Sequence, residues 1–510
     1  MNFRWLSLLT LGGCLALAGC TPWYGIPCPV QSSEGPEGQC ACDPGTYGSL
    51  EWDDDSGAYL GSCRTGLEEA LRTGNPASLE EEAEILSEAR GELARILDRH
   101  NSLLRGIYAD DPIDYIPGAW SHHILSTRPE DTFVLVQGSQ AGYSLAALGQ
   151  QGESNYAGFG FNLLRDFYDG GHAGYRPAFD RLLTWMLTDS PTGTVPTDLS
   201  VAVASIGWDQ GAVYDWLVSE HPSWEIEQCS DTDDLAACLS GNDLVVLGSS
   251  GDNSQAEALG EATRQAVEAG TAVLFVHTEG WTSTARGSAI LSELGMSLGD
   301  YGGNYWSEDS ADWDLVEDML EQGGVIGALD IMLAHFEAGD FNFDWSYCTT
   351  SVGRTTCGDV PGFRTEFLNG AEALKGLLAQ LDREGVDLFS LQERRLSKLC
   401  VLLADFYRDR IVYPLSKSDE DILPFLRAYY ADHVVHYRRQ FNPSQGDLGS
   451  FSGLVLAEET GLQDSSVSIE VSRYGGFTAV GYYALPGVPF TVRLLSGAEL
   501  NPQVHINTQR

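Results

Sequence analysis

"DLVVLGSSG" (residues 243–251) and "TAVLFVHTEG" (residues 271–280) are the stretches that decide the fold of the central part of this chain. In each, a continuous run of Val, Leu and Phe ends on small or polar residues, and the helical pattern of residues 254–270 lies between the two runs. Runs that are apolar at every position predict strands buried on both faces of a sheet. A strand, a helix and a second strand in this order predict a right-handed parallel crossover.

Two further runs extend this pattern toward the N-terminus, TFVLVQG (residues 132–138) and LSVAVASIG (residues 199–207). The second run is followed by the helical pattern GAVYDWLVSE (residues 211–220). We therefore predict a multidomain protein in which residues 115–340 form an α/β domain of flavodoxin or amidotransferase type with a parallel sheet.

Helical patterns flank the α/β segment on both sides. Over residues 65–114, Ser78 followed three positions later by Glu81 predicts a capping box, and apolar residues recur at helical spacing as far as about Arg105. Over residues 341–441, three stretches each carry a wide apolar face. They predict a helical bundle, because two or three antiparallel helices would bury those faces together.

The composition limits the classes of partner. The chain has 510 residues, which is too long for one core and predicts roughly three or four domains. Its 73 acidic and 29 basic residues give a formal net charge of −44. Such acidity argues against binding nucleic acid or an anionic membrane surface through bulk electrostatics, and it identifies no substrate.

The N-terminus has the layout of a bacterial lipoprotein signal peptide. After Arg4, an apolar stretch from Trp5 to Ala18 leads into Leu-Ala-Gly-Cys ending at Cys20, which resembles a lipobox. The stretch is too short to span a bilayer as a stable helix. We expect residues 1–19 to be a signal peptide and Cys20 to carry lipid, which predicts an exported protein anchored to the outer membrane or cell surface of a Gram-negative bacterium. A plain secretory signal is the alternative.

The remaining cysteines predict disulfides, because export takes a chain into an oxidising compartment. Four of them, Cys28, Cys40, Cys42 and Cys63, lie in residues 20–64, a Gly-, Pro-, Ser- and Asp-rich segment that we expect to be a Cys-rich tether. Two pairs are each separated by nine positions, Cys229 with Cys238 and Cys348 with Cys357. Cys400 has no nearby cysteine in the sequence. We expect four disulfides, with the pairing inside the first group open, and a buried free thiol at Cys400. A zinc site in the first group is the alternative, although no C-x-x-C pair occurs there.

Two candidate chemical sites follow the predicted strands. The loop from Gly248 to Ser254 joins a strand to a helix, as anion-binding loops do, but it lacks the G-x-G-x-x-G fingerprint and the Walker lysine. His277 and Glu279 lie at the end of the next strand and would make an acid/base pair. No G-x-S-x-G elbow and no suitably placed cysteine supply a nucleophile. We therefore favour a structural turn and hydrogen-bonded loop residues at these positions.

No metal-binding motif occurs in the sequence. None of the ten histidines forms H-E-x-x-H, in which the i, i+4 spacing puts two imidazoles on one face of a helix. His433 and His436 form an H-V-V-H pair on a predicted helix, but no third ligand accompanies them, and packing is the favoured interpretation. We predict no catalytic residue and no metal ligand in this chain.

Aromatic residues in loops are the last candidates, because exposed rings can stack on sugar rings. Five lie at predicted strand ends or in the segment GDYGGNYW (residues 299–306): Tyr301, Tyr305, Trp306, Trp208 and Trp281. Ordinary packing is the competing interpretation, since aromatic rings contribute apolar area with or without a ligand. We retain the five as possible glycan-binding residues.

The C-terminal part of the chain resembles a known family. The tail GFTAVGYYALPGVPFTVRL (residues 476–494) is similar to the strand-turn-strand that opens the β-sandwich before the catalytic domain of enhancin-type zinc peptidases, which cleave mucins and other O-glycosylated proteins. The helical stretch LCVLLADFYRDRIVYPLSKSDEDILPFLRAYYADHVVHYRRQFNPSQGDLGSF (residues 399–451) and the α/β region before it resemble the accessory domains of the bacterial immunomodulating metalloproteases in that group. The resemblance implies that residues 442–510 are an incomplete β-sandwich.

The resemblance also implies a function. It suggests the non-catalytic accessory half of a secreted zinc metallopeptidase, with an O-glycosylated protein or glycan as partner. Zinc, which the family binds through H-E-x-x-H and a downstream glutamate, is expected only in a catalytic domain absent from this chain, so the chain itself is expected to hold no cofactor. A truncated or split gene would give such a chain, because a sandwich that stops after a few strands leaves an uncovered edge. The alternative is a self-standing lipoprotein that binds glycans or glycoproteins without enzymatic activity.

Overall fold

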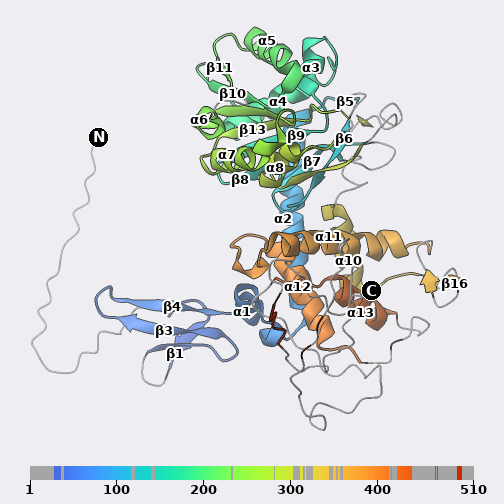
Figure 1. The fold of residues 1–510 in the computed structure, drawn as a ribbon. Helices are drawn as coiled ribbons and strands as arrows, with labels where there is room; N and C mark the ends of the chain where they lie inside the picture. The colour runs from blue at the N-terminus through green and yellow to red at the C-terminus, as the bar shows by residue number, and fades with distance from the viewer. Residues whose placement is uncertain are drawn as a thin grey trace, which may run out of the picture.

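The structure, a computed structural model, describes residues 28–35, 39–116, 121–138, 144–230, 234–280, 282–301, 311–313, 316, 325–343, 349–351, 354–356, 360–412, 415, 422–438, 466, 468 and 491–496. It shows a mixed α/β protein with two packed bodies (Figure 1). A seven-stranded sheet and its helices form the α/β body (residues 113–301), and the helices of residues 325–438 form the helical body. Helix α2 (Glu82–Tyr108) runs between them (Figure 1).

The segment expected to be a tether contains more regular structure than its composition predicts. Strand β1 (Ser32–Glu34) pairs with β2 (Cys40–Cys42), and β3 (Tyr47–Asp53) forms an antiparallel hairpin with β4 (Ala58–Arg64). These strands lie to one side of both bodies (Figure 1). Their side chains are mostly exposed, so disulfides, and not a core, hold them together.

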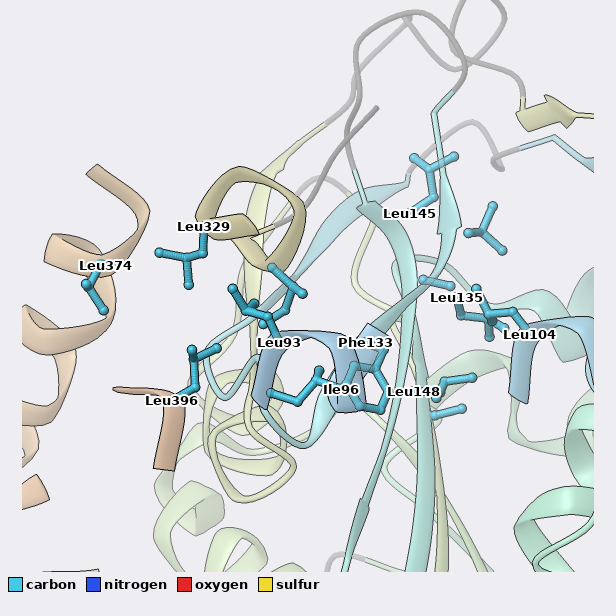
Figure 2. Packing of buried hydrophobic residues seen from close by; sticks show 14 of the residues in the cluster. Leu93, Ile96, Leu104, Phe133, Leu135, Leu145, Leu148, Leu329, Leu374 and Leu396 are labelled. Atoms are coloured by element: carbon cyan, nitrogen blue, oxygen red, sulfur yellow. The ribbon is translucent and has the colours of Figure 1, made fainter. Parts of the chain in front are cut away.

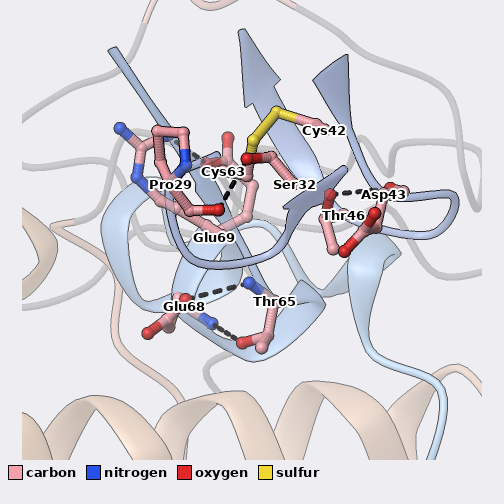
Figure 3. Close-up of a disulfide and its surroundings, with 10 residues drawn as sticks. Pro29, Ser32, Cys42, Asp43, Thr46, Cys63, Thr65, Glu68 and Glu69 are labelled. Carbon is pink, nitrogen blue, oxygen red and sulfur yellow. Dashed lines mark hydrogen bonds and ion pairs between the residues drawn. A yellow bond between two sulfur atoms is a disulfide. The ribbon is translucent and has the colours of Figure 1, made fainter. Parts of the chain in front are cut away.

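Helix α1 (Gly66–Thr73) follows the hairpin and starts with a capping box (Figure 3). The backbone N–H of Glu68 donates to the Thr65 hydroxyl at 3.1 Å, and the backbone N–H of Thr65 donates to the Glu68 carboxylate at 2.9 Å. The two side chains thus satisfy N–H groups that the helix itself leaves unpaired.

The capping box predicted at Ser78 and Glu81 is wrong. Ser78 ends a short 3₁₀ turn (Pro76–Ser78), and its hydroxyl donates to the carbonyl oxygen of Gly66 at 2.6 Å. Helix α2 therefore begins later, at Glu82, with no side-chain cap, and it continues slightly beyond the predicted end. The Ser78 hydroxyl, which the sequence pattern assigns to the helix cap, bonds instead to a residue 12 positions earlier in the chain.

Helix α2 belongs to both bodies. Its N-terminal half packs on the helical body and its C-terminal half on the α/β body, through α10 (Val325–Ala338), α12 (Arg395–Arg408) and α4 (Arg176–Thr188). Figure 2 shows Leu93 facing Leu329 of α10, whereas Leu104 lies near Leu135 of the sheet. One continuous helix thus contributes apolar side chains to one core that extends through both bodies.

The central sheet has the strand order β11-β10-β12-β13-β9-β8-β7. Its strands are β7 (Thr132–Gln137), β8 (Ser144–Gln151), β9 (Ser154–Phe159), β10 (Ser200–Ala204), β11 (Glu225–Gln228), β12 (Leu244–Gly248) and β13 (Ala272–Val276). Neighbours from β11 to β9 are parallel, whereas β8 is antiparallel to both β9 and β7. The run TFVLVQG, predicted as a parallel strand, is the antiparallel edge strand β7. The connection from β7 to β8 is too short for a parallel crossover.

Alternate side chains of the parallel strands pack into two hydrophobic cores, one on each face of the sheet. Val201 and Val203 pack with α3 (Leu163–Tyr168), α4 and α5 (Gln210–Glu220), and Ala202 and Ala204 pack on the other face. The second face is covered by α6 (Leu235–Leu239), α7 (Ala256–Glu268) and α8 (Ala285–Glu293). Burial on both faces is the reason that these strands are apolar at every position.

Smaller ribbons and the helical body complete the fold. The ribbons are β6 (His122–Ser126) with β14 (Met296–Tyr301), β5 (Ile113–Tyr115) with β15 (Ala311–Trp313), and β16 (Thr349–Ser351) with β17 (Arg354–Thr356). The helical body contains α10, a π-helical turn (Phe363–Leu368), α11 (Asn369–Glu384), α12 and α13 (Leu423–His433). Helix α10, which the sequence boundaries put in the α/β domain, packs against α11 and α2.

Part of the predicted C-terminal β region is described. Residues 491–496 form no strand, and Val492 and Leu494 are exposed, although the family resemblance predicts strands in this tail. The rest of the predicted β-sandwich lies almost wholly outside the described residues, as do the signal peptide and Cys20. Among the helices that the structure describes, none has the length and apolar character needed to cross a bilayer.

Candidate functional site

The carboxyl ends of β10, β12 and β13 meet at one edge of the sheet, where open α/β folds bind their ligands. The chain leaves β10 for β11 on one side and then crosses to β12 on the other, so the strand order reverses between β10 and β12. The loop from Gly248 to Ser254 follows β12, and His277 follows β13. The structure therefore brings the two chemical candidates of the sequence to this switch point.

The loops at the switch point are in close contact. Ser205, directly after β10, has a φ of 60°, a value that non-glycine residues seldom adopt. A Cβ on Gly248 would lie 2.4 Å from the carbonyl oxygen of Ser205, and a Cβ on Gly207 would lie 2.7 Å from the Cβ of Ser250. Only glycine fits at these two positions, because the strand ends approach each other too closely for a side chain.

Arg286 of α8 fills the remaining space, with no exposed surface. Its Nη1 donates to the Ser205 hydroxyl at 2.8 Å and to the carbonyl oxygen of Ser250 at 3.1 Å. Its Nε donates to the carbonyl oxygen of Asp252 at 2.8 Å. The loop thus turns oxygen atoms toward a cation, whereas an anion site needs converging N–H groups.

The start of the following helix is also occupied. The Asp252 carboxylate accepts a hydrogen bond from the backbone N–H of Ser254 at 2.9 Å, and hydrogen bonds from Ser254 hold the pKa of Asp252 below its usual value. This carboxylate takes the position that a bound anion would need. The contacts agree with the structural turn that the sequence analysis favours for this loop.

His277 is buried in a closed hydrogen-bond network. Its Nε2 donates to the carbonyl oxygen of Gly280 at 3.0 Å, so its Nδ1 accepts a hydrogen bond from the Ser249 hydroxyl, also at 3.0 Å. Burial, with the neighbouring His122 ring 4.6 Å away, lowers the pKa of His277 to about 4, and the imidazole is neutral at pH 7. Ser249 is fully buried, so this serine and histidine pair offers no surface for a substrate.

Glu279 does not join this network. Its side chain is exposed, whereas His277 points into the protein and has hydrogen-bond partners for both ring nitrogens. The structure therefore gives the proposed acid/base pair no shared proton path.

The histidines of the helical body point to different partners. The Nε2 of His436 accepts a hydrogen bond from the backbone N–H of Leu388 at 3.3 Å, and its Nδ1 lies 3.0 Å from an Asp382 carboxylate oxygen. His433 bonds instead to the carbonyl oxygen of Tyr429 within α13. His436 lies beyond the end of that helix, so the expectation that both histidines share a helix is wrong.

The described cysteines form three disulfides and one free thiol. The pairs are Cys28–Cys40, Cys42–Cys63 (Figure 3) and Cys229–Cys238. With all four cysteines of the N-terminal group paired, none is left for the alternative zinc site. Cys400 is buried and free, and burial raises its thiol pKa to about 12. Cys348 and Cys357 lie outside the described residues.

Among the aromatic candidates, Trp208 is the one whose side chain the structure describes. Its indole is fully exposed, in the turn (Gly207–Asp209) between β10 and α5. Tyr301 ends β14, but its side chain lies outside the described part, as do the residues Tyr305, Trp306 and Trp281. The five residues remain predictions as glycan contacts.

Polar residues from another strand connection reach the turn that bears Trp208. The Asn162 amide donates to the Asp209 carboxylate at 3.2 Å, and the Arg165 guanidinium lies 3.7 Å from the other oxygen of Asp209. Arg165 also lies over the ring of Tyr168, which is 47% exposed. The sequence analysis missed these residues, although the segment NLLRDFYD follows β9 as directly as GWDQ follows β10.

Two family models match this fold. The model described as immunomodulating metalloprotease N-terminal domain matches residues 103–305, and that described as immunomodulating metalloprotease helical domain matches residues 330–440. Both models describe domains of one class of protein, the metalloproteases. The chain belongs to the immunomodulating metalloprotease family, and the resemblance found in the sequence is confirmed.

Individual relatives are similar over the same region. The curated immunomodulating metalloprotease of Pseudomonas aeruginosa is 31% identical over 448 residues, which are 87% of this chain and 48% of that protein. The solved IMPa metallopeptidase of P. aeruginosa matches with a TM-score of 0.65 at 31% identity, over 76% of this chain and 42% of the other. The structure of IMPa with an O-glycopeptide gives the same score and identity, over 76% and 43%. The chain thus spans about half the length of the curated relative it matches.

Proposed function

We propose that this chain is a surface lipoprotein that forms the non-catalytic accessory part of a zinc metallopeptidase acting on O-glycosylated proteins. Family membership carries the proposal, because the similarity extends over the N-terminal domain and the helical domain of the family. Solved relatives are described in complex with T-antigen and with an O-glycopeptide. In this function the chain engages the glycoprotein, and peptide-bond cleavage belongs to another domain.

Zinc is implied by the family, but the residues of this chain do not fit it. The sequence contains no H-E-x-x-H. In the described part of the chain, no three His, Cys, Asp or Glu side chains are grouped so that they could hold a metal ion. We therefore derive no hydrolytic step from this chain and assign zinc only to a catalytic domain outside it.

We also infer the finer fold types from the strand order and the tail. The parallel order β11-β10-β12-β13 supports a flavodoxin or amidotransferase type for the α/β body. The similarity of residues 476–494 to the strand-turn-strand of the peptidase family supports the start of a β-sandwich in residues 442–510.

Export and lipidation are part of the proposal. The Leu-Ala-Gly-Cys sequence supports lipid attachment at Cys20, and the three disulfides support an oxidising compartment. Expression in a Gram-negative host should place the wild-type chain in the outer-membrane fraction and Cys20→Ser outside it. Mass spectrometry of a wild-type product with an unmodified Cys20 would contradict lipidation.

Binding to a mucin-type glycoprotein tests the central function. The purified chain should bind an immobilised O-glycosylated protein and lose most of that binding after enzymatic removal of the O-glycans. Gel analysis should show no cleavage of the glycoprotein, with or without added zinc. Equal binding to the glycosylated and deglycosylated forms would reject glycoprotein recognition, and zinc-dependent cleavage would reject the non-catalytic role.

A further inference from the structure

The indole of Trp208 lies exposed in polar surroundings. Its exposure relative to a free residue is 104%, and within the described residues it makes no ring contact or hydrogen bond. A Cβ on Gly211, at the start of α5, would also meet nothing within 4 Å. The indole is therefore exposed, and the ring is a surface on which a ligand can stack.

Hydrogen bonds and the backbone conformation of Gly207 fix the turn that carries the ring. Asn162, which is 8% exposed, caps α3 with its side-chain oxygen and donates its amide to the Asp209 carboxylate. Gly207 supplies the left-handed backbone, with φ 68°, that the turn requires. Because the backbone of the turn is already held in place, only the side chain of Trp208 loses conformational freedom when it binds, which favours affinity.

Polar and charged side chains contact Asp209, which follows Trp208 in the same turn. Arg165 pairs with Asp169 at 2.8 Å and approaches Asp209, and these three side chains are partly exposed. Tyr168 adds a second exposed ring beside Arg165. We call this set, Trp208, Asp209, Asn162, Arg165, Tyr168 and Asp169, the Trp208 surface.

We propose that the Trp208 surface is a saccharide-binding site that takes a neutral hexose or N-acetylhexosamine unit of an O-glycan. The apolar C–H face of such a ring packs on the indole, and its hydroxyls bond to the carboxylates and the guanidinium. The site rests on the proposed function, since it names which part of the glycoprotein is held and where.

The local chemistry favours a sugar over a protein partner. Protein interfaces need a contiguous apolar centre, whereas Trp208 is flanked in sequence by Gly207, Asp209 and Gln210. Asp169, Asp209 and the net charge of −44 disfavour sialylated or sulfated sugars. A single subsite binds weakly, and the repeated glycans of a mucin raise the apparent affinity through multivalency.

Glycoconjugate binding by single variants tests the proposal. The probe is serum albumin that bears many neutral galactose–N-acetylgalactosamine disaccharides, and unmodified albumin is the blank. Trp208→Ala should weaken binding of the conjugate at least tenfold, and Asp209→Asn should weaken it several-fold. The matched control is Tyr437→Ala, which removes a 71% exposed aromatic ring from the helical body and should bind as the wild type does. Melting temperatures should stay the same, because the indole of Trp208 is exposed.

The possible results separate this site from the wider function. If the wild type binds the conjugate and Trp208→Ala binds it equally well, the saccharide site at Trp208 is wrong, whereas the proposed recognition of glycoproteins stands. No wild-type binding to any O-glycoconjugate overturns both. Binding of unmodified albumin that Trp208→Ala removes would identify a protein-docking surface and overturn the saccharide assignment.

Discussion

The buried guanidinium of Arg286 ties together the loops that follow β10 and β12. It reaches the Ser205 hydroxyl and two loop carbonyl oxygens from α8, and the side chain has no exposed surface. A charge is costly to bury unless its hydrogen bonds are satisfied, and here protein oxygens supply them. Arg286 therefore replaces a ligand at the switch point of the sheet.

Substitution of this residue should destabilise the α/β body. Arg286→Met keeps the apolar stem but leaves loop oxygens without donors, and we expect a loss of about 3 kcal/mol in the free energy of unfolding. Urea denaturation measures it. Arg264→Met, at a half-exposed position on α7, is the control and should cost less than about 0.5 kcal/mol. Equal urea midpoints for the two variants would show that Arg286 is not a structural tie.

At the scale of elements, a carboxylate of the α/β body caps a helix of the helical body. The backbone N–H groups of Leu396 and Ser397, in the first turn of α12, donate to the Glu130 carboxylate at 3.1 and 3.0 Å, and the Ser397 hydroxyl donates at 2.6 Å. Arg394, which precedes the helix, provides no side-chain cap and pairs with Asp131 at 2.6 Å. The cap and α2 together fix one body against the other.

Removal of this cap should weaken the link between the bodies. Glu130→Ala leaves two buried N–H groups and a hydroxyl unpaired, and we expect a loss of about 2 kcal/mol and a less cooperative melt. Differential scanning calorimetry should show the transition broaden or split. Glu153→Ala, in the exposed turn between β8 and β9, is the control. A single unshifted transition in Glu130→Ala would mean that α2 alone holds the bodies together.

At the scale of the whole molecule, two buried histidines make the fold sensitive to acid. Burial lowers the pKa of His100 and of His277 to about 4, and the Nε2 of His100 donates to the carbonyl oxygen of Val134 at 2.8 Å. Both folded pKa values lie below the unfolded value near 6.5. The unfolded chain therefore takes up protons first as the pH falls from about 6.5 to 4, and stability falls in that window by up to about 3 kcal/mol for each histidine.

Comparison of variants isolates this effect from the general change in net charge. The urea midpoint of the wild type should fall between pH 7.5 and pH 5.0 by more than that of His277→Asn, in which the side-chain oxygen can still accept from Ser249. His335→Asn, on α10, should behave as the wild type does. An equal drop in the wild type and His277→Asn would contradict a neutral buried imidazole at position 277.

Local signals in the sequence predicted much of the fold. The runs at β10, β12 and β13 are apolar at every position because both faces are buried, and this property can be recognised from residue order alone. Helices α11 and α12 were predicted for a similar reason, since an amphipathic face repeats along the chain in this segment. The TFVLVQG run shows the limit, because a buried antiparallel strand has the same composition as a parallel one.

Predictions that depend on a distant partner were incomplete or wrong. Ser78 looked like a cap, but the Gly66 carbonyl takes its hydroxyl. Trp208 was recognised as a candidate from its place after a strand, whereas Asn162 and Arg165 were missed because they follow a different strand. Asn162 and Arg165 reach Asp209 only because the carboxyl ends of β9 and β10 lie at the same edge of the sheet.

The sequence by itself determined the family, the buried strands and the absence of an H-E-x-x-H zinc motif from this chain, because each depends on a pattern of residues close together in the sequence. The tertiary structure decided that the switch point is closed and that a helix is capped from the other body. Arg286 is 81 residues from Ser205, and Ser397 is 267 residues from Glu130. Hydrogen bonds and burial act through space, so only the folded chain shows which polar groups are satisfied and which aromatic rings are exposed.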